Sequence, residues 1–198
     1  MVSRRRPSER LGVGLVLVAL LAGCGDDAGS DEADGATTTS TASTTTSRTT
    51  DDAEAAQRHA VIDAYNAASE AAIAASAPPA PNPDDPDLVA THTGPMLEQR
   101  QETFLGLRSN GWAIRYPEGS KYRVEVESVE FQSDNVAILE VCVVDDGERF
   151  VVETGEVIAS GLGTVEWSAA MLLVDGSWKL AERREENRWD GEAGCAVD

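Results

Sequence analysis

The clearest strand pattern of the chain lies in Thr164–Glu185, TVEWSAAMLLVDGSWKLAERRE. Apolar residues recur at every second position over residues 164–174, which is the period of a strand with one buried face. Asp175-Gly176 is typical of the two-residue turn of a β-hairpin. Trp178 and Leu180 then resume the alternation. The stretch therefore predicts two long antiparallel strands joined by a tight turn.

The segment before this hairpin carries further strand patterns. Residues 112–116 predict a short strand, and alternating apolar residues predict another over 122–131. The alternation changes phase near Glu127-Ser128, which predicts a β-bulge. Residues 136–144 are apolar on both faces, as expected of a central strand. Two short strands are predicted after it, at 150–152 and 157–158.

Helical patterns precede the strands. Residues 51–77 are rich in alanine and carry one apolar stripe at helical spacing, and Pro78-Pro79 ends this helix. A short helical turn is predicted at 87–92, and Thr93-Gly94-Pro95 begins a third helix that stops at Gly111. Helices followed by hairpin-linked strands indicate an α+β fold, with the helices packed on one face of an antiparallel sheet.

The N-terminus carries the pattern of a bacterial lipoprotein signal. Four arginines precede an apolar run at 11–22 that is too short to span a bilayer, and the small residues Ala22-Gly23 stand before Cys24. We therefore predict that residues 1–23 are removed and that Cys24 carries the lipid. Residues 24–50 are acidic and then almost entirely Thr and Ser, which predicts a disordered stalk. Residues 51–198 are expected to form one domain.

The chain is strongly acidic, with a formal net charge of −19 at pH 7. Removing residues 1–23, which hold four arginines and one glutamate, leaves 12 basic and 34 acidic residues and a charge of −22. A field of this sign repels nucleic acid and anionic lipid headgroups. Nucleic acid is therefore not expected as a partner. The lipid on Cys24 is the expected contact with the cell membrane, on its extracytoplasmic face.

The chain has three cysteines. Cys24 is assigned to the lipid, which leaves Cys142 and Cys195 as a pair in an oxidising compartment. We predict a disulfide between them, which would stabilise the fold by about 4 kcal/mol through the entropy of the unfolded chain. Two separate buried thiols are the alternative. No metal or cofactor is expected, because the only histidines, His59 and His92, complete no set of metal ligands with Cys142 and Cys195.

Several segments together show a resemblance to a known family: Leu21–Cys24, Val141–Asp146, Thr164–Trp167, Asp175–Leu180 and Arg188–Cys195. The chain resembles bacterial lipoproteins that carry a nuclear transport factor 2-like, or cystatin-like, domain beyond a Thr/Ser-rich stalk. The resemblance covers roughly residues 55–198. It implies a cone in which a curved sheet wraps the helices. It implies no single activity, because the superfamily includes isomerases, cyclases, dehydratases and non-catalytic members.

No residues form a recognisable catalytic set. His59 and Asp63 lie four apart on the first predicted helix, but beside its apolar stripe, so we expect them to face solvent. His92 lies in a Thr/Gly/Pro segment and is expected at the surface. Candidates to line a pocket inside the cone are Tyr65, Trp112, Glu140 and Trp167. The alternative is that the aromatic residues fill the core, and that Glu140 lies at the rim of the sheet or pairs with Arg183 or Arg184.

We expect a non-catalytic lipoprotein whose domain binds a small apolar ligand or an envelope protein. A cofactor-free isomerase or cyclase acting on a small hydrophobic substrate is one alternative. An accessory subunit of an envelope transport complex is another. A roomy interior with two or more ionisable groups in hydrogen-bonding reach would favour the enzyme, whereas an interior filled by tryptophan would favour a scaffold or binding domain.

Overall fold

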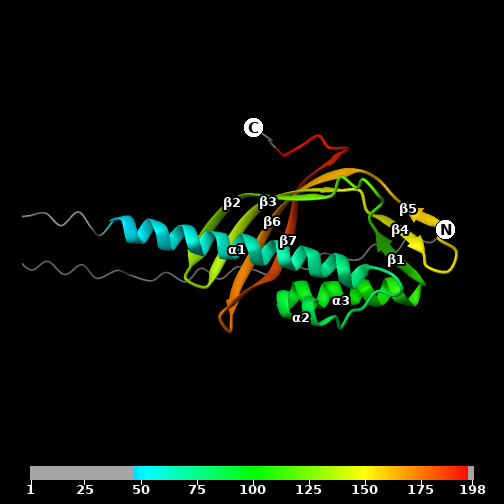
Figure 1. The fold of residues 1–198 in the computed structure, drawn as a ribbon, viewed down its shortest axis with the longest axis horizontal. Helices are drawn as coiled ribbons and strands as arrows, with labels where there is room; N and C mark the ends of the chain where they lie inside the picture. The colour runs from blue at the N-terminus through cyan, green and yellow to red at the C-terminus, as the bar shows by residue number, and fades with distance from the viewer. Residues whose placement is uncertain (1–46, 196–198) are drawn as a thin grey trace, which may run out of the picture. The chain divides into compact units, whose positions relative to one another are not determined.

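The computed structural model describes residues 47–195 (Figure 1). The predicted signal peptide, the predicted lipidation site Cys24 and residues 24–46 of the predicted stalk lie outside the described residues. Side chains are described from residue 52 onward.

Three helices precede the strands, as the sequence predicted: α1 (Ser47–Ser76), α2 (Pro86–Thr91) and α3 (Gly94–Ser109). α1 begins at Ser47, four residues before the predicted start of the domain at residue 51. An established helix extends at little cost, because each added residue gains a backbone hydrogen bond. At α2, the Asp85 carboxylate caps the helix by accepting from the backbone N–H groups of Asp87 and Leu88, at 3.0 and 3.3 Å.

Four long antiparallel strands form the main sheet, in the order β2 (Arg123–Ser133), β3 (Val136–Asp145), β6 (Gly163–Val174) and β7 (Ser177–Asp190). The predicted bulge in β2 is present, because the register with β3 shifts between Val126 and Ser128. β3 is internal, as its two apolar faces predicted. β7 contains two further register shifts against β6, which the sequence analysis did not predict.

A smaller sheet lies at one end of the main sheet (Figure 1). Its strands, in the order β1 (Trp112–Arg115), β4 (Glu148–Val151) and β5 (Val157–Ala159), pair antiparallel. β1 follows directly from α3, so this sheet holds the C-terminal end of that helix.

The β6–β7 hairpin turns as its sequence predicted. Asp175 and Gly176 have φ angles of 51° and 79°. Both positions therefore lie in the left-handed region, which a type I′ turn requires.

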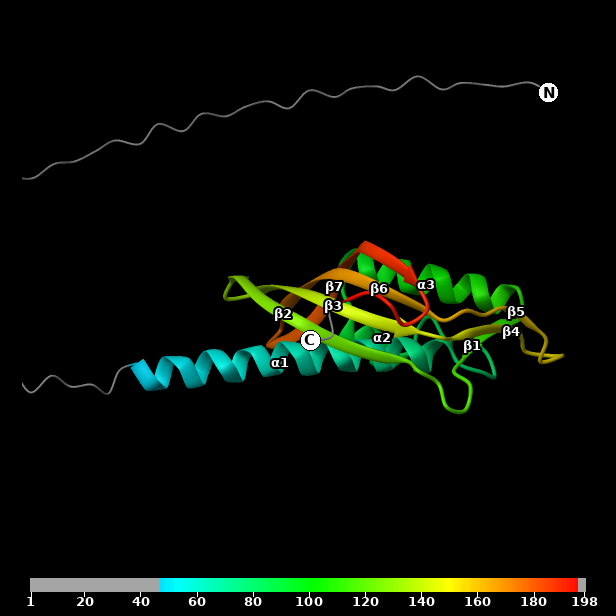
Figure 2. The ribbon, with the colours of Figure 1, turned by 90° about the horizontal axis from the view of Figure 1, so that it is seen from above.

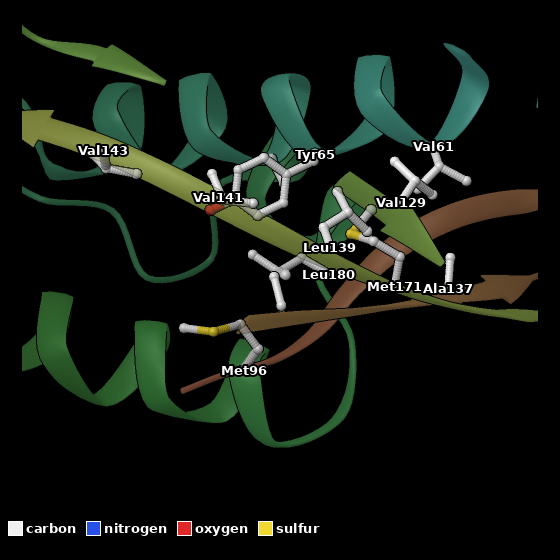
Figure 3. Close-up of a cluster of buried hydrophobic side chains, with 12 residues drawn as sticks. Val61, Tyr65, Met96, Val129, Ala137, Leu139, Val141, Val143, Met171 and Leu180 are labelled. Carbon is white, nitrogen blue, oxygen red and sulfur yellow. The ribbon is translucent and has the colours of Figure 1, made fainter. Parts of the chain in front are cut away.

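The helices cover one face of the main sheet, and its strands bend around them (Figures 1 and 2). α1 and α3 both contact β7, and α1 also contacts β2. Figure 3 shows Val61 and Tyr65 of α1 projecting toward Leu139 and Val141 of β3. The fold is therefore α+β, with the helices packed on a curved antiparallel sheet, which is the arrangement that the family resemblance implied.

The opposite face of the main sheet holds the C-terminal tail. Cys142 alternates with Val141 and Val143, which pack toward the helices, so its side chain projects from the outer face. A disulfide joins Cys142 to Cys195, with their Cα atoms 5.8 Å apart. In Figure 1 the tail accordingly lies on the far side of the sheet from α3. Within residues 47–195, no helix is both long and apolar enough to cross a membrane.

Candidate functional site: a cavity lined by arginine

A cavity of about 410 Å³ lies between α1, α3 and the inner face of the main sheet. Its wall includes Ala72 of α1 and Phe104 of α3, together with Val143 of β3 and Trp167 of β6. The lining also includes Gly161 and other exposed residues, so the cavity opens to solvent near the β5–β6 connection. The interior of the domain is therefore not filled by its own side chains.

Two arginines contribute positive charge to the cavity wall. Arg100 lies on α3, one helical turn before Phe104, and so shares its inward face. Arg183 lies on β7, and its Cζ atom is 3.9 Å from the centre of the Trp167 ring. The Nε atom of Arg100 is buried and has no hydrogen-bond partner within the described part of the chain. Burial, together with the charge of Arg183, lowers the pKa of Arg100 to about 10, so it stays protonated at neutral pH.

Neither cavity arginine has an acidic partner. Among residues 52–195, no carboxylate oxygen lies within 4.0 Å of the guanidinium nitrogens of Arg100 or Arg183. A third lining arginine, Arg188, is engaged with Glu185 through contacts of 3.0 and 2.6 Å. The wall also contains Asp190, which is exposed.

Phenol and carboxyl groups form another part of the wall. The rings of Tyr116 and Tyr122 lie 4.9 Å apart and tilted. Burial raises the pKa of Tyr116, and so do the charge of Asp145 and a hydrogen bond to that carboxylate. Burial also raises the pKa of Tyr122. Both phenols therefore keep their protons at neutral pH and act as hydrogen-bond donors rather than bases.

The backbone of Gly147 packs closely against Asp145 and Tyr116. Its N–H donates to Asp145 Oδ1 at 2.9 Å. A Cβ atom at this position would meet Asp145 Oδ1 at 3.1 Å and the Tyr116 ring at 3.3 Å. The close approach of backbone, carboxylate and phenol therefore depends on glycine.

The bulges of β7 decide which of its side chains reach the cavity. Met171 pairs with Leu180 but Ala170 pairs with Glu182, so Ala181 is an extra residue in β7. One extra residue reverses the alternation, and Arg183 therefore faces inward with Leu180 instead of outward. The alternating charges of residues 182–186 are typical of a solvated strand face, and they give no sign of this bulge. The inward position of Arg100 could be predicted from the sequence, because Arg100, Phe104 and Leu107 have helical spacing and so share one face of α3.

The four predicted pocket residues fall in different places. Trp167 lines the cavity. Tyr65 is completely buried in the core, and its hydroxyl has no partner among the described residues. Trp112 lines a second hollow of about 320 Å³ beside Pro79–Pro81, where Arg149 lies over its ring. Glu140 alternates with the inward residues of β3 and lies on the outer face of the sheet. Burial raises its pKa, and so do the charges of Glu186 and Glu166.

The two histidines also differ from each other. His59 is exposed on α1, as is Asp63, in agreement with the expectation that they face solvent. His92 is only 1% exposed, so the prediction of a surface histidine was wrong. A bridge between His92 and Leu180 of β7 draws the segment between α2 and α3 into the core. Burial and the nearby Arg100 lower the pKa of His92 to about 4.

One set of side chains brings metal-ligand atoms together, at Glu127, Cys142 and Cys195 within 4.8 Å. Two of these atoms are the sulfurs of the disulfide, which are not thiolates and so are poor metal ligands.

No protein-family model matches the chain. No curated protein matches it. Among solved structures, the chain is similar to the intermembrane space region of the chloroplast protein ARC6, with 14% identity over 62% of this chain and 91% of that chain and a TM-score of 0.50. It is also similar to a ketosteroid isomerase-like protein from Erwinia carotovora atroseptica SCRI1043, with 17% identity over 63% of this chain and 91% of that chain and a TM-score of 0.42. The likeness to the ARC6 region concerns the fold alone.

Proposed function

We propose that this protein is a lipid-anchored binding protein that works on the extracytoplasmic face of the cell membrane and holds a small molecule in the cavity of its folded domain. The cavity is the observation that carries the proposal. Its volume of about 410 Å³ is in the range of small-molecule sites. Its wall combines aromatic and apolar side chains with arginine, serine and aspartate, so it can hold the apolar body of a ligand and bind a polar group of it.

The anchor is supported by the sequence of residues 1–24 and by the disulfide. A bond between Cys142 and Cys195 fits an oxidising compartment outside the cytoplasm. The surplus of acidic residues fits a domain that stays clear of anionic headgroups.

A substitution at Cys24 tests the anchor. We expect Cys24→Ala to move the protein from the membrane fraction to the medium, because no lipid is attached. Ser30→Ala is the control, since it changes a neighbouring small residue and leaves the predicted lipid site intact. A Cys24→Ala protein that stays in the membrane would contradict the anchor.

Occupancy of the cavity is tested on the full-length protein, extracted from membranes in mild detergent. Ser69 lines the cavity, so Ser69→Phe is expected to fill it. Ala74→Phe adds the same ring on the exposed side of α1 and serves as the matched control. Mass spectrometry of solvent extracts should find a small molecule with the wild type and Ala74→Phe that is depleted with Ser69→Phe. Identical extracts from all three would refute a ligand site here.

An isomerase or a related enzyme is the second candidate. The specific observation in its favour is that Tyr116 and Asp145 lie side by side in the cavity wall, both next to Gly147, because a phenol can donate to an oxyanion and a carboxylate can accept a proton. Both histidines lie outside the lining, so the base would be one of the carboxylates in the wall, and Asp145 is the one beside Tyr116. Turnover of a ketone substrate that is lost in Asp145→Asn, while the ligand still binds, would replace the binding proposal by this one.

A further inference from the structure

We propose that the ligand is a small organic monoanion with an aromatic or apolar body, and that its carboxylate lies between the guanidinium groups of Arg100 and Arg183. This inference rests on the proposed function and names the chemical class of the ligand. It replaces the expectation of a purely apolar ligand.

The first support is the pairing of arginines across the domain. Five of the nine arginines among residues 52–195 form ion pairs: Arg58, Arg115, Arg123, Arg184 and Arg188. Two of the others, Arg108 and Arg149, are exposed, so water solvates their charge. Arg100 and Arg183 alone are both unpaired and partly withdrawn from solvent. They are also the two that line the cavity without an acidic partner.

The second support is the free energy that two unpaired arginines in the cavity wall cost the folded protein. The chain has 35 acidic residues, so a carboxylate partner would be easy to supply. A guanidinium that is withdrawn from water without a partner destabilises the folded protein, and two like charges add repulsion. The charge of Arg183 acts on Arg100 in this way. A bound anion between the two groups removes both penalties.

The third support is the geometry of the two side chains. The guanidinium of Arg183 lies over the Trp167 ring, which orients the planar group. The unpartnered Nε of Arg100 is an N–H donor with no acceptor in the described residues. A carboxylate accepts two such donors side by side, which is the strong charge-assisted form of the hydrogen bond.

The remaining wall fits the body of such a ligand. Ile73, Phe104 and Val143 offer apolar surface in the same cavity. A cavity of about 410 Å³ has room for a fused aromatic acid but not for a long lipid chain. The test therefore uses 2-naphthoate as the probe, and its uncharged amide, 2-naphthamide, as the comparison of matched shape.

The experiment is calorimetry with the full-length protein in nanodiscs of neutral lipid, with empty nanodiscs as the blank. We expect 2-naphthoate to bind the wild type about ten- to a hundred-fold more tightly than 2-naphthamide, the range of one or two charge-assisted hydrogen bonds. Arg100→Gln and Arg183→Gln should each remove this preference, because each weakens the binding of 2-naphthoate. Arg108→Gln is the matched control on α3 and should keep the preference, because it loses the same charge outside the cavity.

The outcomes separate this inference from the proposed function. Equal binding of the two probes to the wild type would overturn the anion site and leave a small-molecule cavity. Binding of neither probe would overturn both. A preference that survives in Arg100→Gln and Arg183→Gln would place the anion elsewhere and overturn the inference.

A stability measurement distinguishes a binding role of Arg100 from a structural one and does not need a ligand. We expect Arg100→Met to raise the melting temperature of the ligand-free protein, because methionine fills the space without an unpaired charge. Arg100→Lys should keep part of the preference for 2-naphthoate, since it retains the charge. A lower melting temperature in Arg100→Met would show that Arg100 supports the fold, and would overturn the assignment.

Discussion

At the scale of single residues, the unusual feature is a set of buried polar atoms without partners. Tyr65 Oη, Arg100 Nε and His92 Nε2 are buried and unpaired within the described residues. Each such group destabilises a folded protein by about 1–3 kcal/mol. The charge of Arg100 lowers the pKa of His92, and Tyr65 is among the groups that act on the pKa of Arg100. The free-energy cost of the unpaired polar atoms is therefore concentrated around Arg100.

His92 makes stability depend on pH. Its Nδ1 is 3.2 Å from the Leu88 carbonyl oxygen, which can only accept, so Nδ1 carries a proton, and a pKa of about 4 leaves Nε2 without one at neutral pH. The folded-state pKa of about 4 lies below the usual 6.5. Protonation therefore favours the unfolded chain, and stability falls as the pH drops from about 6.5 to 4. We expect this group to remove up to about 3 kcal/mol over that range.

A pair of variants checks this assignment by chemical denaturation at pH 7 and pH 4. His92→Asn retains a hydrogen-bonding group that stays neutral at both pH values. The difference in unfolding free energy between this variant and the wild type should therefore be smaller at pH 4 than at pH 7, by up to about 3 kcal/mol. His59→Asn, on the exposed side of α1, is the matched control. A His92→Asn deficit that is the same at both pH values would contradict a buried neutral histidine.

At the scale of elements, the sequence predicted most helices and strands because their buried faces repeat with clear periods. Val61, Tyr65 and Ala68 follow the helical period, and Val165 to Met171 follow the period of a strand. The site was not predictable in the same way. Arg183 reaches the cavity through a bulge at Ala181, and a bulge in a charged segment leaves no break in an apolar pattern. His92 is buried by a contact with β7, which is remote in sequence.

Replacing glycine by alanine should change the stability of the protein in opposite directions in α3 and in the β6–β7 turn. Gly106 lies in α3, is exposed, and a Cβ atom there would meet nothing within 4 Å. Gly106→Ala should therefore stabilise the protein by about 0.5–1 kcal/mol, since alanine favours the helix. Gly176 has a φ of +79° in the β6–β7 turn. Gly176→Ala should destabilise the protein by about 1 kcal/mol, because a side chain strains that conformation.

Thermal or denaturant unfolding of the two variants measures both changes in free energy. Equal signs for Gly106→Ala and Gly176→Ala would contradict either the helix or the tight turn. Loss of the hairpin register alone would leave the Gly106→Ala effect intact, so the two elements are tested separately.

At the scale of the whole molecule, the disulfide and the helices act on opposite faces of the main sheet. The helices bury the inner face, and the bridge from Cys142 fastens the C-terminal tail to the outer face. The bridge closes a loop that spans 53 residues and includes β6 and β7. It therefore restrains the strand that carries Arg183.

Removing the bridge should lower the stability of the entire domain. We expect the double variant Cys142→Ala, Cys195→Ala to lose up to about 4 kcal/mol of unfolding free energy, because the unfolded chain gains freedom. Reductant should cause a similar loss in the wild type and none in the double variant. A wild type whose unfolding is unaffected by reductant would contradict a structural disulfide.

The charge of the whole chain is opposite in sign to the charge of the two arginines in the cavity wall. The chain carries a net charge of −19, yet its cavity wall holds two unpaired arginines. An acidic surface repels anions at a distance, so only a ligand that is recognised closely gains from the interior charge. The arrangement favours selective capture over rapid association.

The measurement that decides whether the cavity arginines recognise an anion is an NMR titration of the arginine Nε–H signals with 2-naphthoate, assigned through Arg100→Lys and Arg183→Lys. We predict that the signals of Arg100 and Arg183 shift together and saturate, while those of the exposed Arg108 and Arg149 stay in place. Unchanged signals of Arg100 and Arg183 at concentrations that saturate binding in calorimetry, or equal shifts of all four, would contradict the proposed site.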